Sequence, residues 1–210
     1  MRTRLRKLRA GRSFYALCAA LVLSIAGLEM GLPFLPAYFE ELGVRGESNL
    51  LWWSGLAQAV TFLASLACTP LWGRLGDRIG RKRMLVRAHL GLAAALALLS
   101  LARTPLEATL ARIAHGALSG LAPAALALVA EGRRSKQRMA WVQSSLAAGA
   151  MLGPLAGALL LPHIGAARLY LIGAVLAALC ASLVGWAARE APRPVSGRSG
   201  PTRAMALAPF

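Results

Sequence analysis

Six apolar segments, each long enough to cross a membrane, constrain the fold of this chain more than any other feature. A helix needs about 20 mostly apolar residues to span the hydrocarbon core of a bilayer. Short connections join the segments, which run over residues 14–39, 50–72, 84–101, 106–130, 139–161 and 166–188. We therefore expect an all-α membrane protein with six transmembrane helices, surrounded by lipid.

The basic residues alternate between the two ends of the expected helices. The formal net charge is +16, and 20 of the 24 basic residues flank the whole apolar region or lie in or beside the connections after its second and fourth segments. Short loops rich in Lys and Arg stay in the cytoplasm. The sequence therefore predicts a multi-pass protein of the plasma membrane with both termini in the cytoplasm. The charges form no single stripe, so nucleic acid is not an expected partner.

This charge pattern divides the chain into three parts. Residues 1–13 are expected to form a basic cytoplasmic N-terminus, and residues 14–188 a helical bundle. Residues 189–210 are rich in Pro, Gly, Ser and Arg and are expected to form a flexible cytoplasmic tail. The abundance of Ala, Gly and Arg favours a bacterial origin and hence a bacterial inner membrane.

The connection after the second segment is the densest charge cluster of the chain. It reads Gly73-Arg74-Leu75-Gly76-Asp77-Arg78-Ile79-Gly80-Arg81-Lys82-Arg83. Its three glycines predict a tight turn, because glycine avoids Cβ clashes. An ordinary cytoplasmic loop explains the arginines but not the spacing of Gly, Asp and Gly. The stretch resembles the signature between helices 2 and 3 of the major facilitator superfamily.

The fourth segment carries Arg112 inside apolar sequence, three residues before His115 and four before Gly116. A charged side chain at this depth costs about 2.5 kcal/mol or more and normally faces a polar interior or a partner. The alternative is snorkelling of Arg112 to the outer surface. The arrangement resembles the fourth-helix motif of the same superfamily, with His115 where Gln is usual. For His115, a buried neutral imidazole and a proton-handling role both stay open.

The fifth segment contains Gly149, Gly153, Pro154 and Gly157 at helical spacing. Small residues at this spacing let two helices approach closely, and the proline adds a bend. The pattern resembles the fifth-helix signature of proton-coupled antiporters in the superfamily, except that Ala158 replaces its final glycine. A plain helix-packing motif is the alternative.

The resemblance covers about residues 16–188 and implies the N-terminal half of a major facilitator transporter. That family has twelve helices in two halves, with substrate bound between them near the membrane midplane. The resemblance further implies a cytoplasmic gate, which is formed by Gly73, Gly76, Asp77, Arg78, Gly80, Arg81, Lys82 and Glu131. Glu29 is the only acid deep in an apolar segment. We expect it to carry a proton or meet a cationic substrate, and to face Arg112.

The likeness is strongest to the multidrug-efflux branch, the drug:proton antiporters. It implies proton-coupled efflux of small drug-like or amphipathic compounds, with a second six-helix half or a second copy of the chain as a further partner. Truncation of a longer transporter is the preferred account of the single half. One alternative is a specific metabolite transporter of the same fold, and another is a non-transporting remnant or subunit.

Enzyme, metal and cofactor chemistry are not expected. The sequence has no Gly-rich phosphate loop with Lys and Ser or Thr and no catalytic His constellation outside the apolar segments. Cys18, Cys68 and Cys180 lack the spacing of metal ligands and are expected to be buried.

Four other polar or aromatic residues carry expectations of their own. Gln58 is expected either to line a pore or to make one interhelical hydrogen bond. Glu41 is expected to be a solvated charge at the outer surface, and Trp72 and Trp141 to lie at the membrane interface.

Overall fold

The computed structural model describes the backbone of residues 2–130 and 135–187, and the side chains of residues 13–130 and 135–186. The described residues form α-helices and one 3-10 turn: α1 (Arg2–Glu29), η1 (Leu32–Phe34), α2 (Leu35–Glu41), α3 (Glu47–Ile79), α4 (Arg81–Leu101), α5 (Pro105–Leu118), α6 (Leu121–Val129), α7 (Ser135–Ile164) and α8 (Ala166–Ala187). Six stretches are long and apolar enough to cross a membrane. The prediction of six transmembrane helices is confirmed.

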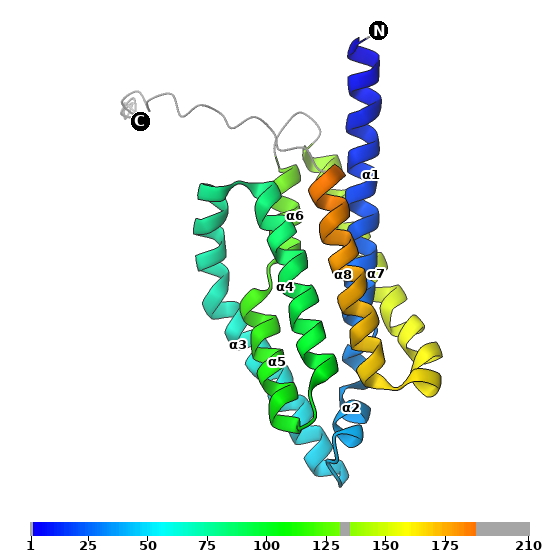
Figure 1. The fold of residues 1–210 in the computed structure, drawn as a ribbon. Helices are drawn as coiled ribbons and strands as arrows, with labels where there is room; N and C mark the ends of the chain where they lie inside the picture. The colour runs from blue at the N-terminus through cyan, green and yellow to red at the C-terminus, as the bar shows by residue number, and fades with distance from the viewer. Residues whose placement is uncertain (1, 131–134, 188–210) are drawn as a thin grey trace, which may run out of the picture.

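The six spans form two groups of three (Figure 1). Helices α1, α7 and α8 pack together, as do α3, α4 and the α5–α6 pair, and the contact between α4 and α8 joins the two groups. Fully buried leucines, among them Leu85 and Leu96 of α4 and Leu169 of α8, belong to the apolar core. In contrast, most of α3 and α7 is exposed, so these two helices offer apolar faces to lipid or to other helices.

The first span is interrupted near its C-terminal end, as its two prolines predict. Helix α1 ends at Glu29, and Pro33 and Pro36 lie in the first turns of η1 and α2. Proline cannot donate a helical hydrogen bond, which favours a break and a restart. The hydroxyl of Tyr170 on α8 donates to the carbonyl oxygen of Gly31 at 2.9 Å, which also accepts from the Phe34 N–H at 3.1 Å, so α8 holds the chain at the break.

The expected tight turn within residues 73–83 occurs at only one of its three glycines. Helix α3 continues through Gly73 and Gly76 to Ile79, and the chain reverses only at Gly80, where φ is 101°. A backbone hydrogen bond of 3.0 Å from Gly80 N to Gly76 O closes the last turn of α3. Only Gly80 therefore needs the left-handed backbone conformation that glycine favours.

The fourth segment was expected to be one helix, but it is broken into α5 and α6. Ser119 is extended, with φ −61° and ψ 178°, and Gly120 has φ 123°. The break lies inside an apolar run, so hydropathy alone gives no sign of it.

Glu41 was expected to be a solvated surface charge, and the structure gives it a partner. Its carboxylate accepts hydrogen bonds from the backbone N–H of Ala166, at 2.9 Å to Oε1 and 3.2 Å to Oε2. Ala166 is the first residue of α8, where unpaired N–H groups attract an acceptor and a negative charge. Glu41 thus links the end of α2 to the start of α8.

The path of the chain brings several helix ends together at one end of the bundle (Figure 1). The start of α1, the turn between α3 and α4 and the end of α8 lie at one end. Basic residues near this turn and at the start of α7 include Arg74, Arg83 and Arg138. Glu131 and the expected tail over residues 189–210 lie outside the described residues.

Candidate functional site

Arg112 is buried inside the bundle with only 1% of its surface exposed. Its Nη1 lies 3.0 Å from Nδ1 of His115, one turn along α5, and its Nη2 donates to Oε1 of Gln58 on α3. The side chain therefore points to polar partners in the interior and does not reach the outer surface. Gln58 makes the interhelical hydrogen bond that was one of its two expected roles.

The contact with Arg112 fixes the protonation of His115. A guanidinium has only donors, so Nδ1 of His115 must be the acceptor in this pair. The imidazole is then neutral, with its proton on Nε2. His115 thus makes the one hydrogen bond expected of a neutral ring, and its proton-handling role stays a prediction.

The approach of α5 to α3 brings Arg112 within reach of Gln58. Gly116 packs against the backbone oxygen of Thr61, in a space that a Cβ atom would fill. The Thr61 hydroxyl is 3.0 Å from the Arg112 carbonyl oxygen and 2.7 Å from that of Ala57. A glycine at this crossing lets the two backbones pack closely, and the polar cluster forms beside it.

Glu29 was expected to face Arg112, but the two side chains are not in contact. Among the described residues, no hydrogen bond or ion pair joins them. Glu29 is half-buried on α1. Within the described part of the chain, Nε of Arg112 is buried and has no hydrogen-bond partner. A buried charge costs free energy unless it is paired and hydrogen-bonded. In that part of the chain, Arg112 therefore has one unsatisfied donor and no acidic partner in contact.

The glycines of α7 pack against α1. A Cβ atom at Gly149 would lie 2.7 Å from the Val22 carbonyl oxygen, and one at Gly153 would lie 2.7 Å from Cβ of Glu29. Gly157 lies against the Met30 carbonyl oxygen in the same way, whereas Pro154 is half-buried. The glycine stripe thus brings α7 into backbone contact with the part of α1 that carries Glu29.

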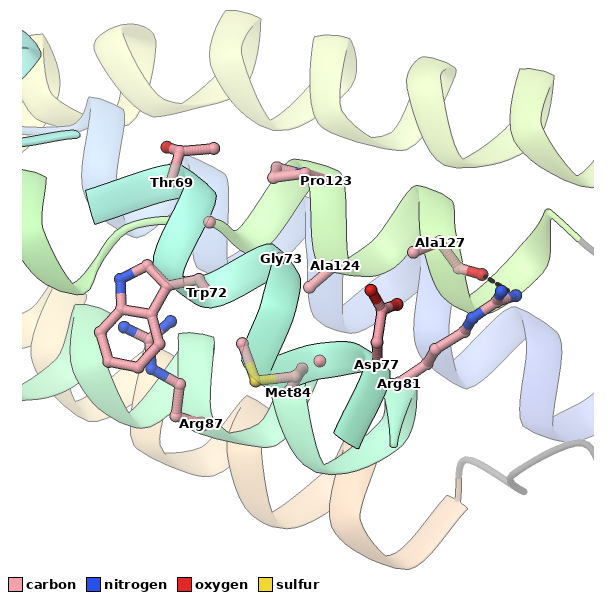
Figure 2. A pocket seen from close by; sticks show the side chains of 12 residues that line it. Thr69, Trp72, Gly73, Asp77, Arg81, Met84, Arg87, Pro123, Ala124 and Ala127 are labelled. Carbon is pink, nitrogen blue, oxygen red and sulfur yellow. Dashed lines mark hydrogen bonds between the residues drawn. The ribbon is translucent and has the colours of Figure 1, made fainter. Parts of the chain in front are cut away.

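Four of the eight residues expected to form a gate line a cavity of about 280 Å³ between α3, α4 and α6 (Figure 2). Gly73, Gly76, Asp77 and Arg81 line it. Asp77 is exposed, and no ion pair joins it to Arg81 among the described residues. Nη1 of Arg81 donates instead to the Ala127 carbonyl oxygen at 2.8 Å. Arg78 is exposed and Lys82 is half-buried; neither lines the cavity.

Two residues of this cavity wall, Trp72 and Arg87, were not predicted as site residues. The Arg87 guanidinium stacks 3.2 Å from the centroid of the Trp72 ring, and both side chains donate to carbonyl oxygens at the end of α5. Trp72 is therefore more than an interfacial aromatic. The signal available in the sequence was the position of Arg87 inside an apolar segment, the feature that drew attention to Arg112.

No group of three or more His, Cys, Asp or Glu side chains able to hold a metal ion occurs among the described residues. The polar side chains that do converge are arginine, glutamine and histidine, and they suit the handling of charge within a membrane.

Comparison with known proteins places the chain among membrane transporters. Residues 17–209 match the family model described as Major Facilitator Superfamily. The chain is 40% identical over 175 residues to "Multidrug resistance protein MdtG" of Citrobacter koseri, covering 81% of the chain and 43% of that protein. It is 37% identical over 174 residues to the protein of the same name from Dickeya zeae, covering 81% and 42%. The chain thus spans less than half the length of these relatives.

A solved structure shows the same fold. The match is to the crystal structure of the human organic anion transporter MFSD10 (TETRAN), with a TM-score of 0.70 over 85% of this chain and 47% of that one. The sequences are 21% identical, so this likeness concerns the arrangement of the helices alone.

Proposed function

This chain belongs to the major facilitator superfamily, and we propose that it forms the N-terminal half of a proton-coupled exporter of small drug-like or amphipathic molecules. The relatives named as multidrug resistance proteins support the substrate class. The six spans support a half-transporter, because the family binds substrate between two such halves. The chain spans 43% of one of these relatives, so a second six-helix half or a second copy completes the proposed substrate path.

The observation that carries the proposal is the buried polar cluster of Arg112, Gln58 and His115, in a bundle whose first span carries the half-buried acid Glu29. Among the described residues, Nε of Arg112 has no hydrogen-bond partner, and Glu29 is a half-buried acid on α1. An ionised Glu29 attracts the guanidinium, and a protonated one does not. Binding or loss of one proton therefore changes the force between α1 and α5, which links protonation to helix position.

The proposed orientation places the basic end of the bundle in the cytoplasm, in a bacterial inner membrane. Short basic connections stay inside, and the turn between α3 and α4 and the end of α6 both lie at this end of the bundle (Figure 1). The cavity lined by Asp77 and Arg81 then faces the cytoplasm. We assign the gate to this region, with Glu131 as a further partner.

Transport by reconstituted protein tests the proposed function. We would insert the chain into vesicles alone, and together with the C-terminal half of the Citrobacter koseri relative, and then follow a fluorescent cationic dye under an imposed proton gradient. Gradient-driven dye movement with the second half supports the proposal, and movement with the chain alone favours a working homodimer. A folded chain that is silent in both settings removes the efflux function and favours a non-transporting remnant.

A further inference from the structure

The fourth span consists of two helices, α5 and α6, and at their junction the last carbonyl groups of α5 have no partners within the helix. Helix α5 ends at Leu118, and α6 begins at Leu121 after an extended Ser119 and a left-handed Gly120. The last carbonyl groups of a helix have no partners within it. Inside an apolar membrane interior such groups need acceptable donors from elsewhere, because water is absent.

Trp72 and Arg87 supply those donors. Nε1 of Trp72 donates to the Ala117 carbonyl oxygen at 2.6 Å. Nη2 of Arg87 donates to the Leu118 carbonyl oxygen at 3.0 Å, and Nη1 to that of Ser119 at 3.3 Å. The guanidinium stacks on the indole, so each side chain orders the other. We call this pair the α5 clamp.

Close packing also holds the α5 side of the junction. A Cβ atom on Gly91 of α4 would lie 3.0 Å from Cβ of Leu118, so α4 touches the last turn of α5. One turn earlier, Gly116 packs against α3. Both neighbours of α5 therefore restrain the end of the helix that carries Arg112.

On the α6 side of the junction, one face of the helix borders a cavity. The residues that α6 turns toward α3 are small, and with Gly120 they line the cavity of about 280 Å³: Pro123, Ala124 and Ala127 (Figure 2). Arg81 contacts α6 at the Ala127 carbonyl oxygen, near its far end. Space is therefore available on one face of α6 that is not available beside the end of α5.

We propose that Ser119–Gly120 is a hinge, about which α6 pivots into the cavity while the α5 clamp holds α5 and Arg112 in place. Gly120 supplies the flexible point, because glycine, which has no Cβ atom, populates positive and negative φ about equally well. Arg81, on the first turn of α4, would then sense the position of α6. The hinge goes beyond the proposed function, and its test requires no transport.

Distances between spin labels measure the positions of α5 and α6 separately, each relative to α8. We would place the full chain in nanodiscs, with its three native cysteines replaced by serine, and label two pairs of exposed positions. The first pair joins Ala130, at the end of α6, to Leu179 on α8, and the second joins Ile113 on α5 to the same Leu179. The hinge predicts a broader distance distribution for the Ala130 pair than for the Ile113 pair.

Variants of the clamp separate a positioning role from a general contribution to stability. Arg87→Gln should broaden the distance distribution of the Ile113 pair, because α5 loses two of its capping donors. Trp72→Phe keeps a ring for stacking but loses the N–H donor, so it should broaden that pair less. Arg83→Gln removes an exposed charge from the same helix and should leave both distributions unchanged.

Gly120→Ala tests the flexible point. Alanine disfavours a φ of 123°. This variant should therefore change the mean distance of the Ala130 pair and leave the distance distribution of the Ile113 pair unchanged. Equal widths for the two pairs in the unmodified chain would overturn the hinge, and so would an Arg87→Gln variant with a narrow Ile113 pair. If Arg87→Gln does not fold, Trp72→Phe and the unmodified chain decide between the same outcomes.

Discussion

At the scale of single residues, Arg112 shows which features the sequence predicts and which it does not. The position of an arginine inside an apolar segment predicted a polar interior, and the side chain is buried as that requires. Its contact with His115 follows from helical spacing of three residues. Its contact with Gln58 and its distance from Glu29 depend on how α1, α3 and α5 pack, and no local pattern encodes that.

The capping role of Trp72 was missed for a related reason. An aromatic residue near the end of an apolar segment is typical of the membrane interface. The broken fourth span is what creates carbonyl acceptors for its indole N–H. Once a helix break escapes prediction, the side chains that satisfy it escape as well.

Gly153→Ala tests the close contact between α7 and α1. A Cβ atom there would lie 2.7 Å from both the Ala26 carbonyl oxygen and Cβ of Glu29. We expect a loss of stability of about 1–3 kcal/mol, because overpacking forces the two helices apart. Gly73→Ala is the matched control, since a Cβ atom there meets nothing within 4 Å. Unfolding in detergent measures both variants, and equal stabilities would contradict the packing.

At the scale of helices, hydropathy predicted the six spans because each must cover the same apolar thickness. It did not predict their ends. Helix α3 runs past Gly73 and Gly76, since a helix tolerates an interior glycine at modest cost when its hydrogen bonds continue. Conversely, the break at Gly120 interrupts an unbroken apolar run. Glycine marks a possible turn, and packing decides which glycine makes one.

The link between α2 and α8 gives a prediction at the scale of these helices. Replacing Glu41 with Ala removes the acceptor for the first N–H of α8. Losing such a cap costs about 1 kcal/mol, so the thermal unfolding temperature should fall. Glu40→Ala is the control, because Glu40 makes only an exposed ion pair of 3.9 Å with Arg45 and such pairs contribute little. Equal melting temperatures for the two variants would show that the link is unimportant.

At the scale of the whole molecule, the alternation of charge predicts the orientation in the membrane. Arg45 and Arg83 are both exposed and lie at opposite ends of α3. In a background without native cysteines, Arg45→Cys should react with an impermeant thiol reagent added outside the cell, and Arg83→Cys only after the inner face is opened. The reverse pattern would contradict the proposed orientation and move the gate to the outer surface.

Proton coupling through Glu29 is the central claim for the complete transporter. The chain paired with a second six-helix half should accumulate dye when a proton gradient is imposed, and should exchange dye without one. Glu29→Gln should abolish gradient-driven accumulation and leave exchange intact, because glutamine keeps the shape of the side chain but carries no proton charge. Glu40→Gln serves as the matched control at the exposed end of the same span.

The most direct measurement is therefore gradient-driven dye accumulation by the Glu29→Gln and Glu40→Gln variants, each normalised to its own exchange rate. Proton coupling through Glu29 predicts that accumulation is lost in Glu29→Gln and retained in Glu40→Gln. Equal accumulation in the two variants would contradict it, and the coupling site would then have to be sought outside the pair of Glu29 and Arg112.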